Sequence, residues 1–257
     1  MAVNATLEKL GQATLRRLEE VGAAARFVAR VAAGLVRLRW EGGQTVLQMA
    51  RAGVDSVPLV LLTGLFSGMV LAYQTASQLL RLGGEGFVGG LIAVSMAREA
   101  APVFAAVTVA GRVGAGFAAE LGTMVVTEQV DALTVMGTDP LEYLVVPRAV
   151  ALVVMLPVLV VLANAVGSLG GYAVSVVVGV PGSVYLESVR QFLDLHDVVG
   201  GLVKSAVFGL VIALVACHKG LRASGGAAGV GQATTGAVVA AIAWVLAANY
   251  FLDVLLF

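Results

Sequence analysis

The sequence predicts an all-α membrane protein with five transmembrane helices, because its apolar residues form long blocks and its charged residues are sparse. Of the 257 residues, 59% are hydrophobic and 12% are charged, whereas about a quarter of the residues in a soluble domain are charged. A helix of about 20 apolar residues crosses a hydrocarbon core of roughly 30 Å. Five stretches are long enough: Val54 to Leu80, Phe87 to Ala118, Leu144 to Val180, Val198 to Cys217 and Ala233 to Phe257.

The lengths and the small residues of these stretches predict how they pack. The second and third stretches are longer than one straight span requires, so each must tilt, extend beyond the bilayer or contain a break. Gly64 and Gly68 in the first stretch, like Gly111 and Ala115 in the second, are small residues at four-residue spacing. This spacing lets helix backbones approach closely. The Gly-rich segment at 223–232 predicts a loop between the fourth and fifth spans.

Residues 1–45 form a separate N-terminal segment before a transmembrane domain at 46–257. Between residues 5 and 39, apolar residues recur at three- and four-residue spacing, which predicts an amphipathic helix. Such a helix either lies in the membrane interface or is solvated and packs on a partner. Eight Lys and Arg residues precede the first span, so the N-terminus is predicted to be cytoplasmic and, after five spans, the C-terminus external.

Two adjacent charged residues, Arg98 and Glu99, lie about 11 residues into the second span. A charge at membrane depth costs at least about 2.5–3.5 kcal/mol, so it normally faces a cavity or a partner. Neighbouring helical residues point about 100° apart, so these two do not simply pair with each other. They either line a polar pocket that holds or gates a headgroup, or contact another helix, for example at Gln74. Arg112 follows Arg98 by 14 residues and is predicted to share its helix face.

The connection between the second and third spans predicts a short cytoplasmic helix at Thr127 to Met136. Val130, Leu133 and Met136 form an apolar stripe beside acidic residues. A solvated acidic loop is the simplest interpretation of the charges. The apolar stripe, however, must be buried against something, and a short helix with one apolar face suits a groove in a cytoplasmic partner.

The sequence carries no pattern that indicates catalysis, a metal site or nucleic-acid binding. Net charge is zero, so bulk electrostatics give no case for a nucleic-acid partner. A P-loop requires a Gly-rich loop followed by Lys, and the Gly-rich run at 225–236 lacks that Lys. His196 and His218 are predicted on opposite sides of the membrane. Lys204 and Ser205 are adjacent in a helix and do not face each other. Any ATPase activity must therefore belong to another chain.

The stretch from Ser95 to Arg148 resembles the core of the MlaE/YrbE permease family, the membrane subunits of bacterial lipid-transporting ABC systems that work with MCE proteins. It contains, in order, RE, P, AGR, AELG, TEQ, DAL, DP and P. The FSGMVLAYQ segment (66–74) and residues 218–239 are also similar to that family, and the resemblance covers about residues 45–257. Where many members have Leu-Gly before the proline, this chain has Ala100 and Ala101, which leaves the local helix packing open.

The resemblance implies a permease subunit of the bacterial inner membrane that moves phospholipid between that membrane and the outer envelope. It implies a homodimer with two cytoplasmic ABC ATPase subunits below, a hexameric MCE-domain ring on the outer side and a small cytoplasmic STAS-type subunit. No cofactor is expected in this chain, because ATP and Mg would bind the ATPase. The alternatives are a scaffold that anchors MCE and ATPase subunits, or transport of another lipid such as a sterol. An intramembrane lipid-modifying enzyme would need a nucleophile or metal constellation that the sequence lacks.

The resemblance also assigns expected roles to individual residues. Arg98 and Glu99 match the family's RE pair near the lipid cavity, and Tyr73 and Gln74 match first-span positions that line it. Residues 127–136 match the coupling helix that seats in the ATPase. The expected ATPase contacts within it are Glu128, Asp131 and Leu133.

Overall fold

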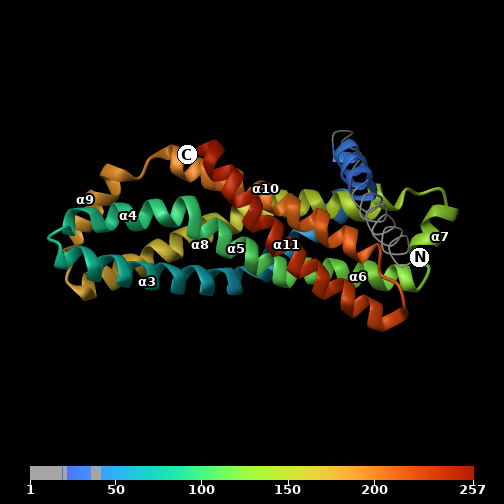
Figure 1. The fold of residues 1–257 in the computed structure, drawn as a ribbon, viewed down its shortest axis with the longest axis horizontal. Helices are drawn as coiled ribbons and strands as arrows, with labels where there is room; N and C mark the ends of the chain where they lie inside the picture. Colours follow the sequence, from blue (N-terminus) through green and yellow to red (C-terminus); the bar gives the residue numbers. More distant parts are fainter. Residues whose placement is uncertain (1–18, 20–21, 36–41) are drawn as a thin grey trace, which may run out of the picture.

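The computed structural model describes Glu19 and residues 22–35 and 42–257, which form an elongated helical bundle (Figure 1). Five helical segments of this part of the chain are long and apolar enough to cross a membrane. They are Gly42–Arg81, Glu85–Val126, Leu141–Val178, Leu195–Gly220 and Gly226–Leu256. The prediction of an all-α membrane protein with five spans is confirmed.

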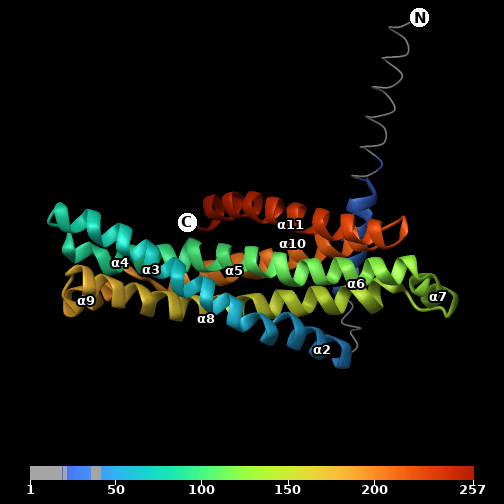
Figure 2. The same cartoon turned by 90° about the horizontal axis from the view of Figure 1, so that it is seen from below.

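The first span consists of two helices, α2 (Gly42–Ala52) and α3 (Val57–Arg81), joined by a 3₁₀ turn at Val54–Ser56. Pro58 lies in the first turn of α3, where its missing N–H breaks no intrahelical hydrogen bond. Both helices run diagonally across α8 (Figure 2). The first helical segment therefore begins at Gly42, before Val54, where the sequence predicted the first span to start.

The second span is α4 (Val88–Ser95), α5 (Ala101–Val109) and α6 (Ala115–Val126), preceded by a 3₁₀ turn at Glu85–Phe87. Two π-helical turns, Met96–Ala100 and Ala110–Gly114, separate these helices. A π turn inserts one extra residue into an α-helix and is often found at functional sites. These turns are the interruptions that the length of the stretch required, and they contain Arg98, Glu99 and Arg112.

The remaining elements complete the bundle. After α7 (Gln129–Val135), a third π turn (Leu141–Val145) leads into α8 (Val146–Val178), followed by α9 (Gly182–Phe192), α10 (Leu195–Gly220) and α11 (Gly226–Leu256). The short helix α7 lies at one end of the bundle and α9 at the other (Figure 1). The predicted loop at 223–232 is wrong over most of its length, because α11 begins at Gly226. Gly225 and Gly226 adopt φ values of +86° and +70°, and this left-handed pair completes the chain reversal.

Helices α3 and α8 approach each other closely. A Cβ atom at Gly64 would lie 2.9 Å from the Ala163 carbonyl oxygen, and one at Gly68 would collide with the backbone of Gly167. The predicted role of the first pair of small residues is confirmed. In the second span, a Cβ atom at Gly111 would have nothing within 4 Å in the described chain, whereas Gly114 and Ala118, which have the same spacing, face α10: a Cβ atom at Gly220 would lie 2.8 Å from the Ala118 carbonyl oxygen.

Part of the predicted N-terminal amphipathic helix is described. Residues 22–35 are helical, whereas the rest of residues 5–39, apart from Glu19, lies outside the described residues. Phe27 and Val31 are buried against the bundle, and the Phe27 ring lies 5.0 Å from the His218 ring. Arg26 and Arg30 are exposed. One face of the described segment therefore packs on the bundle and the other carries charge.

Candidate functional site

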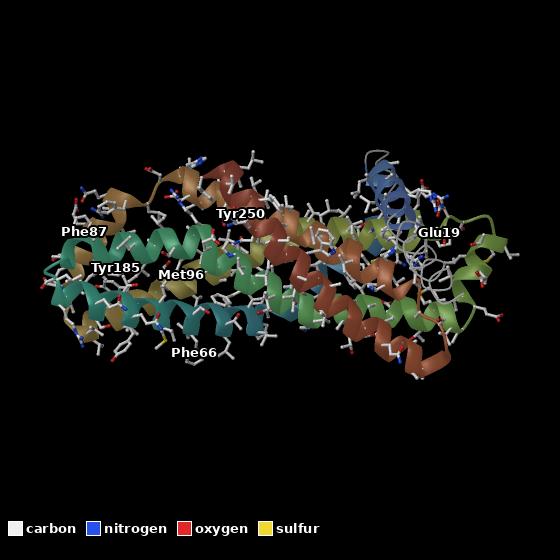
Figure 3. The ribbon with its side chains drawn as sticks, viewed as in Figure 1. Glu19, Phe66, Phe87, Met96, Tyr185 and Tyr250 are labelled. Carbon is white, nitrogen blue, oxygen red and sulfur yellow. The ribbon has the colours of Figure 1, made fainter. Side chains whose placement is uncertain are left out.

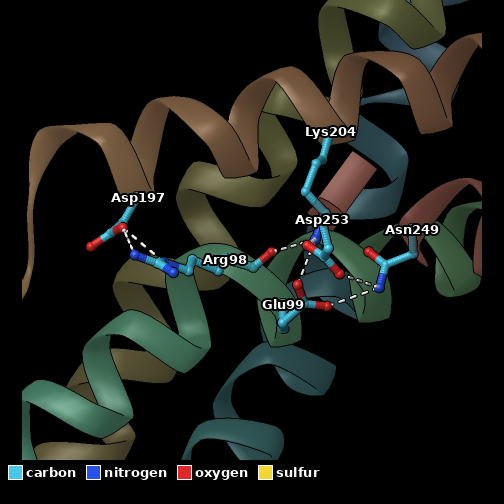
Figure 4. A network of polar contacts seen from close by, with 6 residues as sticks. All are labelled: Arg98, Glu99, Asp197, Lys204, Asn249 and Asp253. Atoms are coloured by element: carbon cyan, nitrogen blue, oxygen red, sulfur yellow. Dashed lines mark hydrogen bonds and ion pairs between the residues drawn. The ribbon is translucent and has the colours of Figure 1, made fainter. Parts of the chain in front are cut away.

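Arg98 and Glu99 share the first π turn but bind different helices (Figure 4). The Arg98 guanidinium donates through Nε to Asp197 Oδ1 at 2.7 Å, and its Nη2 atom lies 2.6 Å from the same oxygen. The Asp197 side chain is 2% exposed, and its Oδ2 accepts a hydrogen bond from the backbone N–H of Asp194. The carboxylate that binds Arg98 is thus fixed by the first turn of α10.

Glu99 belongs to a group of polar side chains centred on Lys204, which is completely buried. The Lys204 ammonium lies 2.6 Å from Glu99 Oε1 and 2.5 Å from Asp253 Oδ1. Asn249 Nδ2 donates to Glu99 Oε2 at 2.9 Å and to Asp253 Oδ2 at 3.2 Å. Spans two, four and five therefore meet through charged side chains. We call the six residues involved the Lys204 cluster: Arg98, Glu99, Asp197, Lys204, Asn249 and Asp253.

A proline explains why Lys204 also contacts the helix backbone. In an α-helix the carbonyl of Arg98 would accept the N–H of the residue four positions later, but that residue is Pro102, which has none. The Lys204 ammonium donates to the Arg98 carbonyl oxygen at 2.9 Å. The lysine thus satisfies a backbone acceptor and two carboxylates at once.

The charged pair lies beside an apolar groove. The side chains of Arg98 and Glu99 are 37% and 44% exposed. The groove has a volume of about 380 Å³ and lies between α3 and α5. It begins at Ala100, the residue after Glu99. Its lining is Phe66, Ser67, Val70, Leu71, Gln74, Ala100 and Phe104. Phe66 projects away from the bundle (Figure 3).

The two first-span candidates are placed differently. Gln74 lines the groove, and its backbone carbonyl accepts a hydrogen bond from Ser77 Oγ. The partners of Arg98 and Glu99 come from α10 and α11 instead. Tyr73 is 60% exposed, on the same outward stripe of α3 as Phe66 and Val70. Sequence reasoning noticed Lys204 but missed its role, and it missed Asn249 and Asp253. Their four-residue spacing on one helix face was the available signal.

Arg112, in the second π turn, contacts the first span rather than α10. Its Nη1 atom donates to Ser56 Oγ at 2.8 Å and to the Arg51 carbonyl at 3.3 Å, and Nη2 lies 3.6 Å from Asp55. We call Arg112, Asp55 and Ser56 the Arg112 cluster. The prediction that Arg112 and Arg98 point to the same side is wrong, because the inserted residues of the π turns change the helical register between them.

The helix α7 presents its acidic residues to solvent. Glu128 and Asp131 are exposed, and Glu128, at φ +61°, is the only described non-glycine residue with a positive φ. Leu133 is half-buried and packs toward the core of the bundle. The strongly exposed apolar residues are instead Val135 and Met136, at 88% and 69%.

No group of three His, Cys, Asp or Glu side chains that could hold a metal ion lies within residues 22–35 and 42–257. His196 and His218 lie near opposite ends of α10.

Comparison with known proteins decides the family. Residues 45–255 match the model of the family described as permease MlaE. The chain belongs to the MlaE permease family. It is 40% identical to a probable ABC transporter permease protein of Rickettsia typhi over 249 residues, 96% of each chain. It is 45% identical to one of Synechocystis sp. over 214 residues, 83% of this chain and 81% of the other.

A plant protein is also related. The MlaE permease is 38% identical to protein TRIGALACTOSYLDIACYLGLYCEROL 1, chloroplastic, of Arabidopsis thaliana over 231 residues, 90% of this chain and 65% of that protein. The predicted family is confirmed. The chain is thus an ABC transporter permease, a multi-pass transport subunit rather than an enzyme, and its class implies an ATPase partner.

Proposed function

We propose that this MlaE permease moves phospholipid between the inner membrane and the outer envelope, with the headgroup passing beside Arg98 and Glu99. The observation that carries the proposal is that Arg98 and Glu99, both partly exposed, directly precede Ala100, which lines an apolar groove of about 380 Å³. A phospholipid has matching parts, since its phosphate is attracted to a guanidinium and its acyl chains to apolar side chains. The name of the Arabidopsis relative refers to a diacylglycerol lipid, which adds support.

The two halves of the proposed site have separate tasks. Asp197 holds the Arg98 guanidinium and Lys204 holds the Glu99 carboxylate, so both charges are oriented before a headgroup arrives. Gln74, which lines the groove, and Tyr73, on the neighbouring exposed stripe of α3, would contact the lipid beside its acyl chains. A lipid moving past this point exchanges water for fixed charges, which lowers the cost of desolvating its headgroup.

Energy for the movement would come from ATP and Mg bound by the separate cytoplasmic ATPase, with α7 as its docking element. Glu128 and Asp131 offer exposed carboxylates for basic residues of the ATPase, and Val135 and Met136 offer apolar contacts. Leu133, which packs toward the bundle, would transmit the partner's motion to α6 and α8 rather than touch the partner itself.

The proposed assembly is a homodimer in the bacterial inner membrane with a cytoplasmic N-terminus. An unbroken apolar stripe on α3 is exposed in the single chain: Leu59, Leu62, Phe66, Val70 and Tyr73. Lipid or a second copy would cover this stripe. The hexameric MCE ring on the outer side and the small cytoplasmic STAS-type subunit belong to the same proposal.

The pocket is tested with Arg98→Ala and Glu99→Ala in the permease assembled with its ATPase and reconstituted in vesicles. Photoactivatable phospholipid should crosslink to the native chain and much less to either variant, and ATP-driven lipid transport should fall with it. Arg81→Ala removes an exposed charge at the end of α3 and serves as the control. Unchanged crosslinking and transport in both variants would favour the scaffold function, in which lipid passes elsewhere.

The docking of α7 is tested separately. Glu128→Lys combined with Asp131→Lys reverses both exposed charges and should abolish co-purification of the ATPase, because like charges would then face its basic residues. Glu187→Lys on α9, at the opposite end of the bundle, is the matched control. Retention of the ATPase by the double variant would contradict the proposed contact.

A further inference from the structure

The charges of the Lys204 cluster do not balance. Arg98 and Asp197 form a complete pair. Glu99 and Asp253, however, share the single ammonium of Lys204. Among the described residues the cluster therefore holds three carboxylates and two cations, and one negative charge has no counter-charge. An unpaired charge in a membrane bundle is costly, so a further cation is expected at this position.

Among the described residues Lys204 is the one cation paired with these two carboxylates, and both of them are open to a ligand from outside. The side chains of Glu99 and Asp253 are 44% and 29% exposed. Asn249 donates to both carboxylates, and its own Oδ1 is buried without a donor from the described residues. The site thus lacks both a positive charge and N–H donors, and a primary ammonium group supplies both.

Arg98 places a second requirement on the same ligand. Its guanidinium is 37% exposed and lies one residue from Glu99, so a group that binds here meets a cation and an unbalanced carboxylate side by side. A zwitterionic headgroup matches this arrangement, with its phosphate toward Arg98 and its ammonium toward Glu99 and Asp253. An anionic headgroup leaves the extra carboxylate uncompensated. A choline headgroup brings the charge without N–H donors.

We propose that the Lys204 cluster selects phospholipids that carry a primary ammonium group, such as ethanolamine lipids, over lipids with an anionic glycerol headgroup. This inference rests on the proposed function, since it names the substrate class of the same site. His196, also on α10, lies with its Nε2 2.8 Å from the Leu256 carbonyl oxygen, and its ring meets the Phe257 ring edge to face. The Phe257 ring in turn covers the Arg98 guanidinium at 4.4 Å.

The test uses the permease assembled with its ATPase in vesicles that contain equal amounts of two photoactivatable lipids, one with an ethanolamine and one with a glycerol headgroup. The native chain should crosslink the ethanolamine lipid roughly threefold to fivefold more, the range expected for a half-exposed ion pair. Asp253→Asn keeps the side-chain shape and leaves Lys204 and Glu99 balanced, so the preference should disappear. Asp253→Glu should restore it, and Glu187→Gln, which removes an exposed charge on α9, should leave it unchanged.

The outcomes separate this inference from the function on which it rests. Equal crosslinking of both lipids by the native chain overturns the selectivity while lipid transport stands. A preference that survives Asp253→Asn also overturns it, because the preference would then not depend on the extra carboxylate. If neither lipid crosslinks, the result would instead contradict the proposed function. Should Asp253→Asn fail to assemble, Glu99→Gln tests the same charge from the other carboxylate.

Discussion

The two π turns of the second span carry arginines that are equally exposed, at 37%, but have different carboxylate partners. Arg98 pairs with a carboxylate that is 2% exposed, in a cluster whose lysine is fully buried. Arg112 pairs with Asp55, which is 58% exposed, at the longer distance of 3.6 Å. Half-exposed pairs contribute about 0–1 kcal/mol, whereas breaking a buried pair can cost about 3–5 kcal/mol.

The comparison shows that the same local device serves two purposes. The first π turn joins span two to spans four and five through a cluster that contains a fully buried lysine and the buried carboxylate of Asp197. The second joins it to the first span through a longer and more exposed ion pair and a hydrogen bond to the buried Ser56. The link between span two and the first span is therefore expected to be the weaker of the two.

The largest effect is expected from Lys204→Met. Removal of the ammonium leaves Glu99 and Asp253 facing each other across Asn249, so the free energy of unfolding should fall by about 2–3 kcal/mol. This is less than for a fully buried pair, because both carboxylates are partly exposed. Thermal or denaturant unfolding in detergent measures the loss. Adding Glu99→Gln and Asp253→Asn should recover most of it. If Lys204→Met alone is as stable as the native chain, the cluster contributes little to the free energy of unfolding.

A smaller loss is expected from Gly201→Ala. Gly201 lets α10 approach the first π turn, and a Cβ atom there would collide with the Ala97 carbonyl. Overpacking of this kind costs about 1–3 kcal/mol, and here it also pushes Asp197 and Lys204 away from their partners. Gly111→Ala in the second π turn is the matched control, because its Cβ meets open space in the described chain. If Gly201→Ala and Gly111→Ala unfold at the same temperature, the two π turns do not differ in how closely they are packed.

The smallest effect is expected from Arg112→Ala. Its ion pair with Asp55 is half-exposed, so the free energy of unfolding should change by less than about 1 kcal/mol. The change should shrink further in high salt, because exposed charges are screened. Unfolding measured at low and high ionic strength tests both statements. A loss as large as that of Lys204→Met would mean that Arg112 is buried in the assembled transporter.

Sequence patterns predicted the spans and the short helix between the second and third spans well. The segment predicted at 127–136 contains α7 at Gln129–Val135, because apolar periodicity and Pro or Gly boundaries are local signals. The loop predicted at 223–232 was wrong because only two of its glycines adopt left-handed conformations.

The polar partners could not be predicted in the same way. Arg98 and Glu99 were recognisable from their charge at membrane depth, but their partners are about 100 to 150 residues away in the sequence. Which partner each one meets depends on a single inserted residue in a π turn, and hydrophobic periodicity does not register such an insertion. The same insertion explains why Arg112 was assigned to the wrong side of the helix.

Pro102 has a consequence for how the transporter can move. Because Pro102 has no N–H to donate, the Arg98 carbonyl oxygen accepts a hydrogen bond from an ammonium of α10. A slide of α10 by one turn, about 5.4 Å, would strip this oxygen and two carboxylates of their donor together. Spans two and four are therefore expected to travel as one rigid body during a transport cycle.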